Sequence, residues 1–480
     1  MAKTWAISGV ELHLEVTGAR VGAALESALR EAVQTGRLAE GTRLPSSRAL
    51  AGDLGVARNT VAAAYSRLVA EGWLTARSGA GTRVAARPSV PTGPAGPGRP
   101  ASDAIRSGAT GPGRAAPSRT RPAVRHDLRP GSPDVSLFPR TAWAAASRRA
   151  LQAAPPDVLT YGHTRGLPAL RTALAGYLAR ARGVHTDPER IVVCAGFTQA
   201  LGLLTRVLRA RGSATVGIEA YGDRQHAEVI SAAGLRTHPV PVDEHGAVIG
   251  PAADALLLTP AHQFPLGVPL APDRRAEAVR WAHETGGLII EDDYDGEFRY
   301  DRRPVGALQA LAPEHVVYAG TASKSLAPGL RLAWLVLPAG LVEEVAEAKR
   351  LADGHTSTLE QLTLAEFVAC GGYDRQMRRC RLAYRRRRDR LVSALRREAP
   401  RVRVTGLAAG LHALLELPPG ADEKEIVARA HRRGLALEGL DDYRRAEDAG
   451  RPALVVGYAT PPEHAYTAAL ARLCATLARR

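Results

Sequence analysis

The chain has 480 residues, which is too long for one hydrophobic core and predicts two or more domains. Apolar residues make up 45% and charged residues 23%, as in folded soluble proteins, and the net charge of +16 is only a weak indication of a polyanionic partner. The four cysteines form no CxxC pair, no run of about 18 apolar residues occurs, and the N-terminus lacks a long apolar stretch. We therefore expect no disulfide frame, no zinc or other metal site, no membrane span, and a cytoplasmic location.

Residues 1–85 have the pattern of a compact helical domain. A first helix is predicted over residues 21–33, where apolar residues recur at helical spacing. A second, shorter helix follows the candidate N-cap Ser46 and ends at Gly55, and a third begins near Arg58. Two short helices around a tight turn are typical of a helix-turn-helix. The next stretch, GWLTARSGAGTRVA, predicts a strand, a glycine-rich tip and a second strand.

This order of elements resembles the winged-helix DNA-binding domains of the GntR superfamily. The matching stretches are GRLAEGTRLPSSRALAGDLGVARNTVAAAYSRLVAEGWL and SGAGTRV. The resemblance implies that the operator is contacted by side chains at the starts of the second and third helices and in the wing: Ser46, Arg48, Arg58, Asn59, Thr60, Arg77, Gly79 and Thr82. The alternative is a helical domain whose charges only face solvent, but it would need the capping serine, turn and glycine tip to coincide by chance.

Residues 86–125 change character and predict a linker. The segment contains eight Pro, six Gly and seven Arg against one Asp. Such a composition buries too little apolar surface to offset the entropy of ordering the chain, so we expect a flexible tether. Its arginines allow a second interpretation, in which they contact DNA phosphates.

From residue 126 to residue 480, short apolar runs alternate with amphipathic helical patterns. The runs are IVVCAG (191–196), ATVGIE (214–219), ALLLTP (255–260), GLIIED (287–292) and HVVYAG (315–320). Two of the predicted helices cover residues 166–182 and 272–285. Near-continuous apolar strands between helices indicate an α/β fold with a mainly parallel sheet and helices on both faces.

One lysine lies in a loop rich in hydroxyl groups, after the strand that ends at Gly320. In YAGTASKSLAPGLRLAWLVLP, Lys324 follows Thr321 and Ser323 and precedes Arg331, an arrangement suited to a phosphate beside an amine. A shielded lysine can lose its proton and form a Schiff base with an aldehyde. By itself, the lysine would be expected to be an ordinary surface residue, as most lysines are.

An acidic run supplies a possible partner for that lysine. GLIIEDDYDGEF places Glu291, Asp292, Asp293 and Asp295 directly after an apolar strand, where ligands of doubly wound folds collect. A buried carboxylate at this edge can pair with a protonated pyridine nitrogen. A solvated turn or a metal site is the alternative for the acidic run alone, and the lysine loop makes the cofactor interpretation the more specific one.

These segments resemble fold type I aminotransferases, and together with the N-terminal domain they resemble the MocR family of bacterial regulators. The markers are GFTQAL, TPAHQFPLG, IIEDDYDGEFRYDRRP and GTASKSLAPGLRL. The resemblance implies a winged helix-turn-helix of α+β class, then an α/β aminotransferase-like domain that binds pyridoxal 5'-phosphate (PLP), with a small C-terminal α/β subdomain. It also implies a homodimer.

The resemblance further assigns roles to individual residues. Lys324 would hold PLP as a Schiff base, Asp292 would pair with the pyridine nitrogen, and Tyr294 would bond the 3'-oxygen. The phosphate would be held by the amide of Phe197 and by Thr198, Thr321, Ser323 and Arg331. Tyr161 would reach the cofactor phosphate of the neighbouring subunit, and His262 and Gln263 would line the ring.

Two departures from the aminotransferase pattern bear on activity. The sequence IEAYGDRQH lacks the usual proline-glycine-tyrosine turn, and Tyr221 is the candidate substitute. In PALVVGYAT, Val455 stands where aminotransferases place the arginine that clamps the substrate carboxylate; Arg451 is nearby and expected at the surface. Valine cannot make a bidentate clamp, which argues against efficient transamination.

A helix with nine arginines is predicted at 375–390, RQMRRCRLAYRRRRDR. It is either a solvated basic face or a second phosphate-binding surface, and the resemblance does not decide between them.

Three functions compete. The first is a transcriptional regulator that senses PLP or a PLP–amine adduct and controls vitamin B6 synthesis, or else amino acid or amine metabolism, by altering how a dimer engages operator DNA. The second is an aminotransferase with an attached DNA-binding domain. The third is a regulator whose pocket has lost its cofactor.

Overall fold

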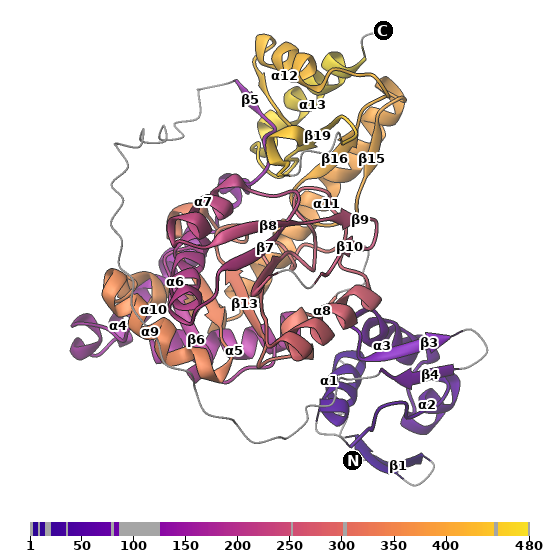
Figure 1. The fold of residues 1–480 in the computed structure, drawn as a ribbon, viewed down its shortest axis with the longest axis vertical. Coiled ribbons are helices and arrows are strands. Elements are labelled where there is room, and N and C mark those ends of the chain that lie inside the picture. Colours follow the sequence, from indigo (N-terminus) through magenta and orange to yellow (C-terminus); the bar gives the residue numbers. More distant parts are fainter. Residues whose placement is uncertain are drawn as a thin grey trace.

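Figure 1 shows the computed structural model of the chain. It describes residues 3–7, 10–14, 21–34, 37–77, 81–85, 125–250, 253–300, 305–445 and 450–478. The predicted linker lies outside the described residues except for Arg125, and so does Gly79 at the tip of the predicted wing.

The N-terminal domain contains the three predicted helices and the two-stranded wing. Its elements are β1 (Lys3–Ile7), β2 (Val10–Leu14), α1 (Val21–Gln34), α2 (Ser47–Leu54), α3 (Arg58–Ala70), β3 (Leu74–Arg77) and β4 (Gly81–Val84). Ser46 caps α2 by accepting a hydrogen bond from the amide of Ala49 at 3.1 Å, and Gly55 ends the helix in the left-handed conformation, with a φ of 65°. The winged helix-turn-helix is therefore confirmed, whereas the β1–β2 hairpin has no counterpart in the sequence prediction.

A seven-stranded sheet forms the centre of the second domain, in the order β6-β14-β13-β12-β11-β7-β8. The strands are β6 (Ile191–Cys194), β7 (Thr215–Glu219), β8 (Arg236–Val240), β11 (Ala255–Leu258), β12 (Leu288–Asp292), β13 (Val316–Thr321) and β14 (Ala333–Val336). All neighbours pair in parallel except β14, which is antiparallel to both β13 and β6. The five predicted apolar runs are all strands of this sheet, and the mainly parallel α/β fold is confirmed.

Helices cover both faces of the sheet (Figure 1). They are α4 (Arg140–Ala153), α5 (Pro168–Arg182), α6 (Phe197–Ala210), α7 (Arg224–Ala232), α8 (Pro272–Thr285), α9 (Val342–Asp353) and α10 (Thr358–Ala369). Because strand side chains alternate, Val192 and Cys194 pack with residues of α6, α7 and α9, while Ile191 and Val193 pack with α5 and α10. Helix α8 covers a further part of that second face over β11 and β12.

A long helix, α11 (Gly372–Glu398), leads into the small C-terminal subdomain. Its antiparallel sheet has the order β15-β16-β19-β18, with β15 (Arg403–Thr405), β16 (Ala413–Glu416), β18 (Glu438–Gly439) and β19 (Ala453–Val456). Helices α12 (Glu423–Arg432) and α13 (Glu463–Leu477) pack against each other in this subdomain. Short β5 (His126–Asp127) pairs with β17 (Leu435–Ala436), so the first residues of the second domain join its last part. A further two-residue hairpin joins β9 (Val242–Asp243) and β10 (Gly246–Ala247).

The winged-helix domain lies against the second domain, close to α8 (Figure 1). The 3-10 helix η4 (Leu308–Leu311) makes part of this contact. Ala310 is only 3% exposed and belongs to the hydrophobic core of the winged-helix domain, with Leu311 packed against the same core. Among the described helices, none combines the length and apolar character needed to span a bilayer.

Candidate cofactor pocket and DNA-reading surface

The predicted DNA-contacting residues lie at the starts of α2 and α3 and in the wing. Ser46, Arg48, Arg58 and Asn59 are exposed, and Thr60 and Thr82 are half-buried. Arg77 ends strand β3, and Gly79 lies outside the described residues. The exposed side chains at the first turn of α3 have the placement that a recognition helix needs to reach base edges in a major groove.

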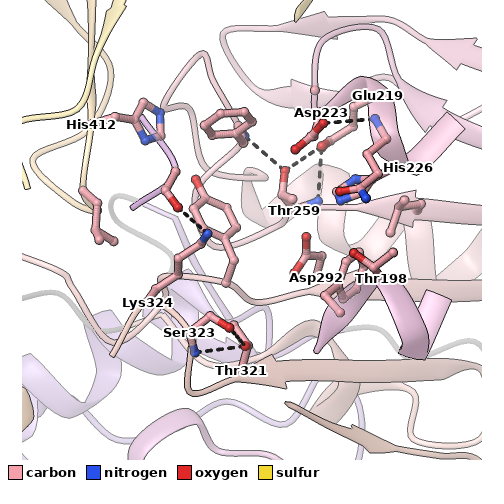
Figure 2. Close-up of a pocket in the computed structure, with 18 of the residues that line it drawn as sticks. Thr198, Glu219, Asp223, His226, Thr259, Asp292, Thr321, Ser323, Lys324 and His412 are labelled. Carbon is pink, nitrogen blue, oxygen red and sulfur yellow. Dashed lines mark hydrogen bonds between the residues drawn. The ribbon is translucent and has the colours of Figure 1, made fainter. Parts of the chain in front are cut away.

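A cavity of about 300 Å³ opens at the carboxyl ends of β7, β12 and β13. The predicted cofactor residues that line it are Phe197, Thr198, Asp292, Tyr294, Thr321, Ser323, Lys324 and Arg331. Figure 2 shows five of these side chains, those of Thr198, Asp292, Thr321, Ser323 and Lys324, around the same pocket. The parallel sheet brings them together because the loops after its strands emerge at one edge.

One end of the cavity can hold a phosphate. Helix α6 begins at Phe197, after Gly196 with a φ of 105°, so its first amides and its positive dipole end face the cavity. A Cβ at Gly196 would lie 2.5 Å from the guanidinium of Arg331, so only glycine lets the guanidinium come this close. Thr321 and Ser323 add hydroxyl groups 3.0 Å apart. Amides, hydroxyls and a guanidinium are the donors that bind a dianion.

Lys324 supplies the amine. Its Nζ donates a hydrogen bond to the backbone oxygen of Gly131 at 2.6 Å, which holds the side chain at the cavity wall (Figure 2). The loop from Thr321 to Arg331 therefore presents both the phosphate donors and the amine.

Asp292 is a carboxylate that lines the same cavity. It is 7% exposed, and burial raises its pKa well above the usual range, while the positive charge of Lys324 acts in the opposite direction. No hydrogen bond reaches its side chain from the part of the chain that the structure describes. A buried carboxyl group without a donor fits a ligand that brings its own N–H, such as a protonated pyridine ring. The residues present thus fit PLP.

Comparison with known proteins agrees with both halves of the chain. The family "Bacterial regulatory proteins, gntR family" matches residues 22–84, and "Aminotransferase class I and II" matches residues 130–436. The pyridoxine biosynthesis regulator PdxR of Corynebacterium glutamicum is 34% identical over 87% of this chain and 88% of its own. The probable rhizopine catabolism regulatory protein MocR of Rhizobium meliloti is 34% identical over 77% of this chain and 76% of its own.

The chain belongs to the MocR family of HTH-type transcriptional regulators. Its second domain is also similar to a solved kynurenine aminotransferase of Pyrococcus horikoshii, with a TM-score of 0.67 and 25% identity over 74% of this chain and 91% of that one. The aminotransferase fold thus explains the pocket, and the GntR domain implies DNA binding.

Two residues that the MocR resemblance assigned to the cofactor ring do not line the cavity, and Tyr161, which it assigned to the neighbouring subunit's phosphate, does not line the cavity of its own chain. His262 and Gln263 lie behind its wall: His262 Nδ1 is 2.9 Å from Asp295 and 3.2 Å from the hydroxyl of Tyr294, and Gln263 bonds loop residues, among them Tyr221 O at 3.0 Å. Tyr161 is 97% exposed and outside the cavity.

His262, Asp295 and His412 form a buried cluster whose ligand atoms lie within 4.8 Å of one another. Hydrogen bonds already join its members to each other and to backbone. His412 Nε2 lies 3.1 Å from the oxygen of Pro265, and burial beside His262 lowers the pKa of His412 to about 3. Hydrogen bonds between these side chains and to the backbone account for the contacts.

The sequence prediction missed a polar wall on the β7 side of the pocket. Glu219 is buried, accepts a hydrogen bond from the Thr259 hydroxyl at 2.6 Å, and has its pKa raised to about 7 by burial. Burial also lowers the pKa of His226 to about 4. Arg445, from the small subdomain, donates to the backbone oxygen of Glu219 at 2.8 Å. The position of Glu219 at a strand end was a usable signal, but nothing in the sequence connects it to Arg445.

The two departures from the aminotransferase pattern take definite places. Tyr221 lines the cavity, as a substitute for the tyrosine of the missing proline-glycine-tyrosine turn must do. Val455 is fully buried in β19, in a hydrophobic cluster with Leu414, and Arg451 is exposed. Among the described residues that line the cavity, the arginines are Arg331 and Arg445.

The arginine-rich helix α11 is of mixed character. Arg387 is 1% exposed, pairs with Asp134 at 2.6 Å and with Glu463 at 2.9 Å, and therefore has a structural role. The exposed members are Arg375, Arg378, Arg379, Arg385 and Arg386. Their exposure agrees with the predicted solvated face, and the phosphate-binding alternative stays a prediction.

Proposed function

We propose that this MocR-family regulator holds PLP on Lys324 and changes its affinity for operator DNA when PLP, or a PLP–amine adduct, fills the pocket. The observation that carries the proposal is Asp292: a buried carboxyl group without a hydrogen-bond donor, in the same cavity as the Lys324 amine and a phosphate-binding helix start. PLP, when bound, supplies an aldehyde for the amine and a pyridine nitrogen for the carboxylate.

The chain's own residues then have distinct tasks. Thr321, Ser323, Arg331 and the first amides of α6 orient the phosphate. Asp292 holds a proton at the ring nitrogen, and the backbone oxygen of Gly131 holds the Lys324 amine at the wall. Tyr294 is fixed by its bond to the backbone oxygen of His262 at 3.0 Å, which supports its proposed contact with the 3'-oxygen.

We propose that the regulated genes are those of vitamin B6 synthesis, as for a regulator of the PdxR type. Support comes from the valine at the position of the carboxylate clamp, since PLP alone needs no such clamp. The similarity to a pyridoxine biosynthesis regulator points the same way. The chain is equally similar to a probable rhizopine catabolism regulatory protein. The alternative gene target is therefore amino acid or amine metabolism, with an amine as the effector.

We further propose that residues 1–85 read DNA, that residues 86–125 tether the reader, and that residues 126–480 form a homodimer. The 97% exposure of Tyr161 supports the dimer, because a partner subunit would both cover this side chain and receive it at its cofactor phosphate. The exposed Arg48, Arg58 and Asn59 support the reader's contact with DNA. We propose the same contact for Ser46, Thr60, Arg77, Gly79 and Thr82.

A titration of operator DNA with and without PLP tests the proposal. We expect the dissociation constants to differ several-fold, and identical curves with PLP demonstrably bound would contradict it. The second candidate, an aminotransferase, is favoured by the guanidinium of Arg445 at the cavity wall. An aminotransferase would convert many amino acid molecules per pocket, whereas a sensor would convert no more than one.

A further inference from the structure

The hydroxyl group of Tyr294, at the cavity wall, is held by one residue that lies behind the wall. Tyr294 Oη donates to the backbone oxygen of His262 at 3.0 Å and lies 3.2 Å from His262 Nδ1. The rings of Phe264 and Tyr294 also pack edge to face, with 5.9 Å between their centroids. His262 therefore contacts the phenol oxygen through both its main chain and its side chain.

Asp295 determines which nitrogen of His262 carries a proton. His262 Nδ1 lies 2.9 Å from Asp295 Oδ2, and the side chains of both residues are no more than 2% exposed. An ionised carboxylate only accepts hydrogen bonds, so this contact needs the proton on Nδ1. With the proton there, Nδ1 is also a donor for the phenol oxygen of Tyr294.

The pair of His262 and Asp295 is closely packed. Gly410 has a φ of 70°, and a Cβ at this position would overlap both Asp295 Oδ2 and His262 Cε1. Two tyrosine hydroxyls donate to the oxygen of Gly410 at 2.5 and 2.7 Å, which fixes this glycine against the pair. His412, which lines the cavity (Figure 2), has its ring centroid 5.0 Å from that of His262. The imidazole of His262 is thus fixed from several sides.

Tyr294 has one hydroxyl proton and two possible acceptors for it. In the structure the proton goes to the backbone oxygen of His262, and in the proposed function it goes to the 3'-oxygen of PLP. Burial, followed by the negative charges of Asp295 and Asp292, raises the pKa of Tyr294 well above its usual range, so the hydroxyl keeps this proton at neutral pH. A donor at Nδ1 makes the phenol a stronger donor in turn, because hydrogen bonds in a chain polarise one another.

We propose that His262 is a positioning residue for Tyr294: its Nδ1–H, oriented by Asp295, holds the phenol hydroxyl where it donates to the 3'-oxygen of bound PLP. The inference rests on the proposed function and adds to it two residues behind the pocket wall. It also gives a role to His262, whose side chain does not line the cavity.

The visible absorbance of bound PLP reports this contact. A proton is shared between the Lys324 nitrogen and the 3'-oxygen, and its loss leaves the negative charge of that oxygen uncompensated. A hydrogen-bond donor stabilises the charged oxygen, so Tyr294 lowers the pKa of the chromophore. Removing the donor, or the residue that places it, should raise this pKa by about 1.

The test is a pH titration of the visible absorbance of the full chain with PLP bound. It compares the native chain with H262L, Y294F and the double variant. We expect H262L and Y294F to raise the chromophore pKa by similar amounts. The double variant should raise it no further, because His262 acts through Tyr294.

H262N is the matched control. Asparagine can place an N–H near the position of Nδ1, so the chromophore pKa of H262N should stay close to the native value. All of these chains keep the other carboxyl, imidazole and guanidinium groups at the cavity, which are those of Glu219, Asp223, His226, Asp292, Arg331, His412 and Arg445. A difference between H262L and H262N therefore reports the Nδ1 contact.

A native chromophore pKa in H262L overturns the proposal. A shift in H262L that persists in full in the Y294F background overturns it too, because that shift does not pass through Tyr294. H262A is a second variant, which removes Nδ1 without adding bulk beside Gly410. Loss of the fold in both H262L and H262A, measured by circular dichroism, would give His262 a structural role and likewise contradict the proposal.

Failure of this inference and failure of the proposed function give different results. PLP bound to Lys324 with an unchanged pKa in H262L leaves the proposed function standing and removes only the role of His262. A native chain that binds no PLP contradicts the proposed function, and this inference falls with it.

Discussion

The DNA reader and the cofactor pocket use charged side chains in opposite ways. The reader's proposed contacts, such as Arg58 and Asn59, are exposed on the first turn of one helix. The pocket's Asp292 and Glu219 are buried, come from different strands, and have raised pKa values because burial disfavours their charged forms. An exposed charged side chain needs only a position on the surface to contact DNA. The protonation and the partners of a buried carboxyl group depend on all the residues packed around it. Substitutions in the pocket should therefore have larger and more specific effects than substitutions on the reader.

The largest effect is expected from K324A, which removes the amine that PLP needs for covalent attachment. Borohydride reduction followed by mass spectrometry should find no adduct on the variant and full labelling of residue 324 in the native chain. K424A is the control, because Lys424 has a side chain that is 85% exposed and lies outside the cavity. Equal labelling of K324A would remove Lys324 from the site.

The next largest effect is expected from D292A. Removing one partner of a buried ion pair costs about 3–5 kcal/mol, so PLP affinity should fall roughly 100-fold or more. Equilibrium dialysis with PLP measures the loss, and D273A, an exposed aspartate on α8, should bind like the native chain. A change of less than threefold in D292A would mean that Asp292 does not pair with the ring.

A smaller effect is expected from R58A in the reader. A lost DNA contact costs about 1–3 kcal/mol, or roughly 5- to 150-fold in operator affinity, and PLP binding should be unchanged. Fluorescence anisotropy with operator DNA measures it. R396A on the exposed face of α11 is the matched control for the loss of one positive charge. Equal losses in both variants would indicate nonspecific attraction by net charge.

The smallest effect is expected from E219Q and concerns pH. The pKa of Glu219 rises from 4.5 to about 7 on folding, so between these values the folded chain holds a proton that the unfolded chain has lost. This group therefore makes the protein less stable as pH rises from 4.5 to 7, with no further change above 7. Urea unfolding at pH 5 and pH 7.5 should show a loss of stability that is smaller in E219Q by roughly 1–2 kcal/mol. Parallel pH profiles for the two proteins would exclude this role.

Much of this molecule could be predicted from local signals. Ser46 and Gly55 mark the ends of a helix because capping needs only neighbouring backbone groups, and the five apolar runs are strands because a doubly covered sheet demands continuous apolar residues. The lysine loop and the acidic run were likewise found from their positions after strands. The antiparallel direction of β14 could not be predicted, because its apolar run of residues looks the same as that of a parallel strand.

The sequence by itself determined which residues cap, which pack, and which carry an amine, a carboxylate or a phosphate-binding helix start, since these properties depend on side-chain type and short spacing. Only the tertiary structure decided that His262 and Gln263 stand behind the pocket wall, that Arg445 joins Glu219 across 226 residues, and that Glu71 meets Gly306. These contacts join segments far apart in the chain. They follow from how whole layers pack, which no local pattern encodes.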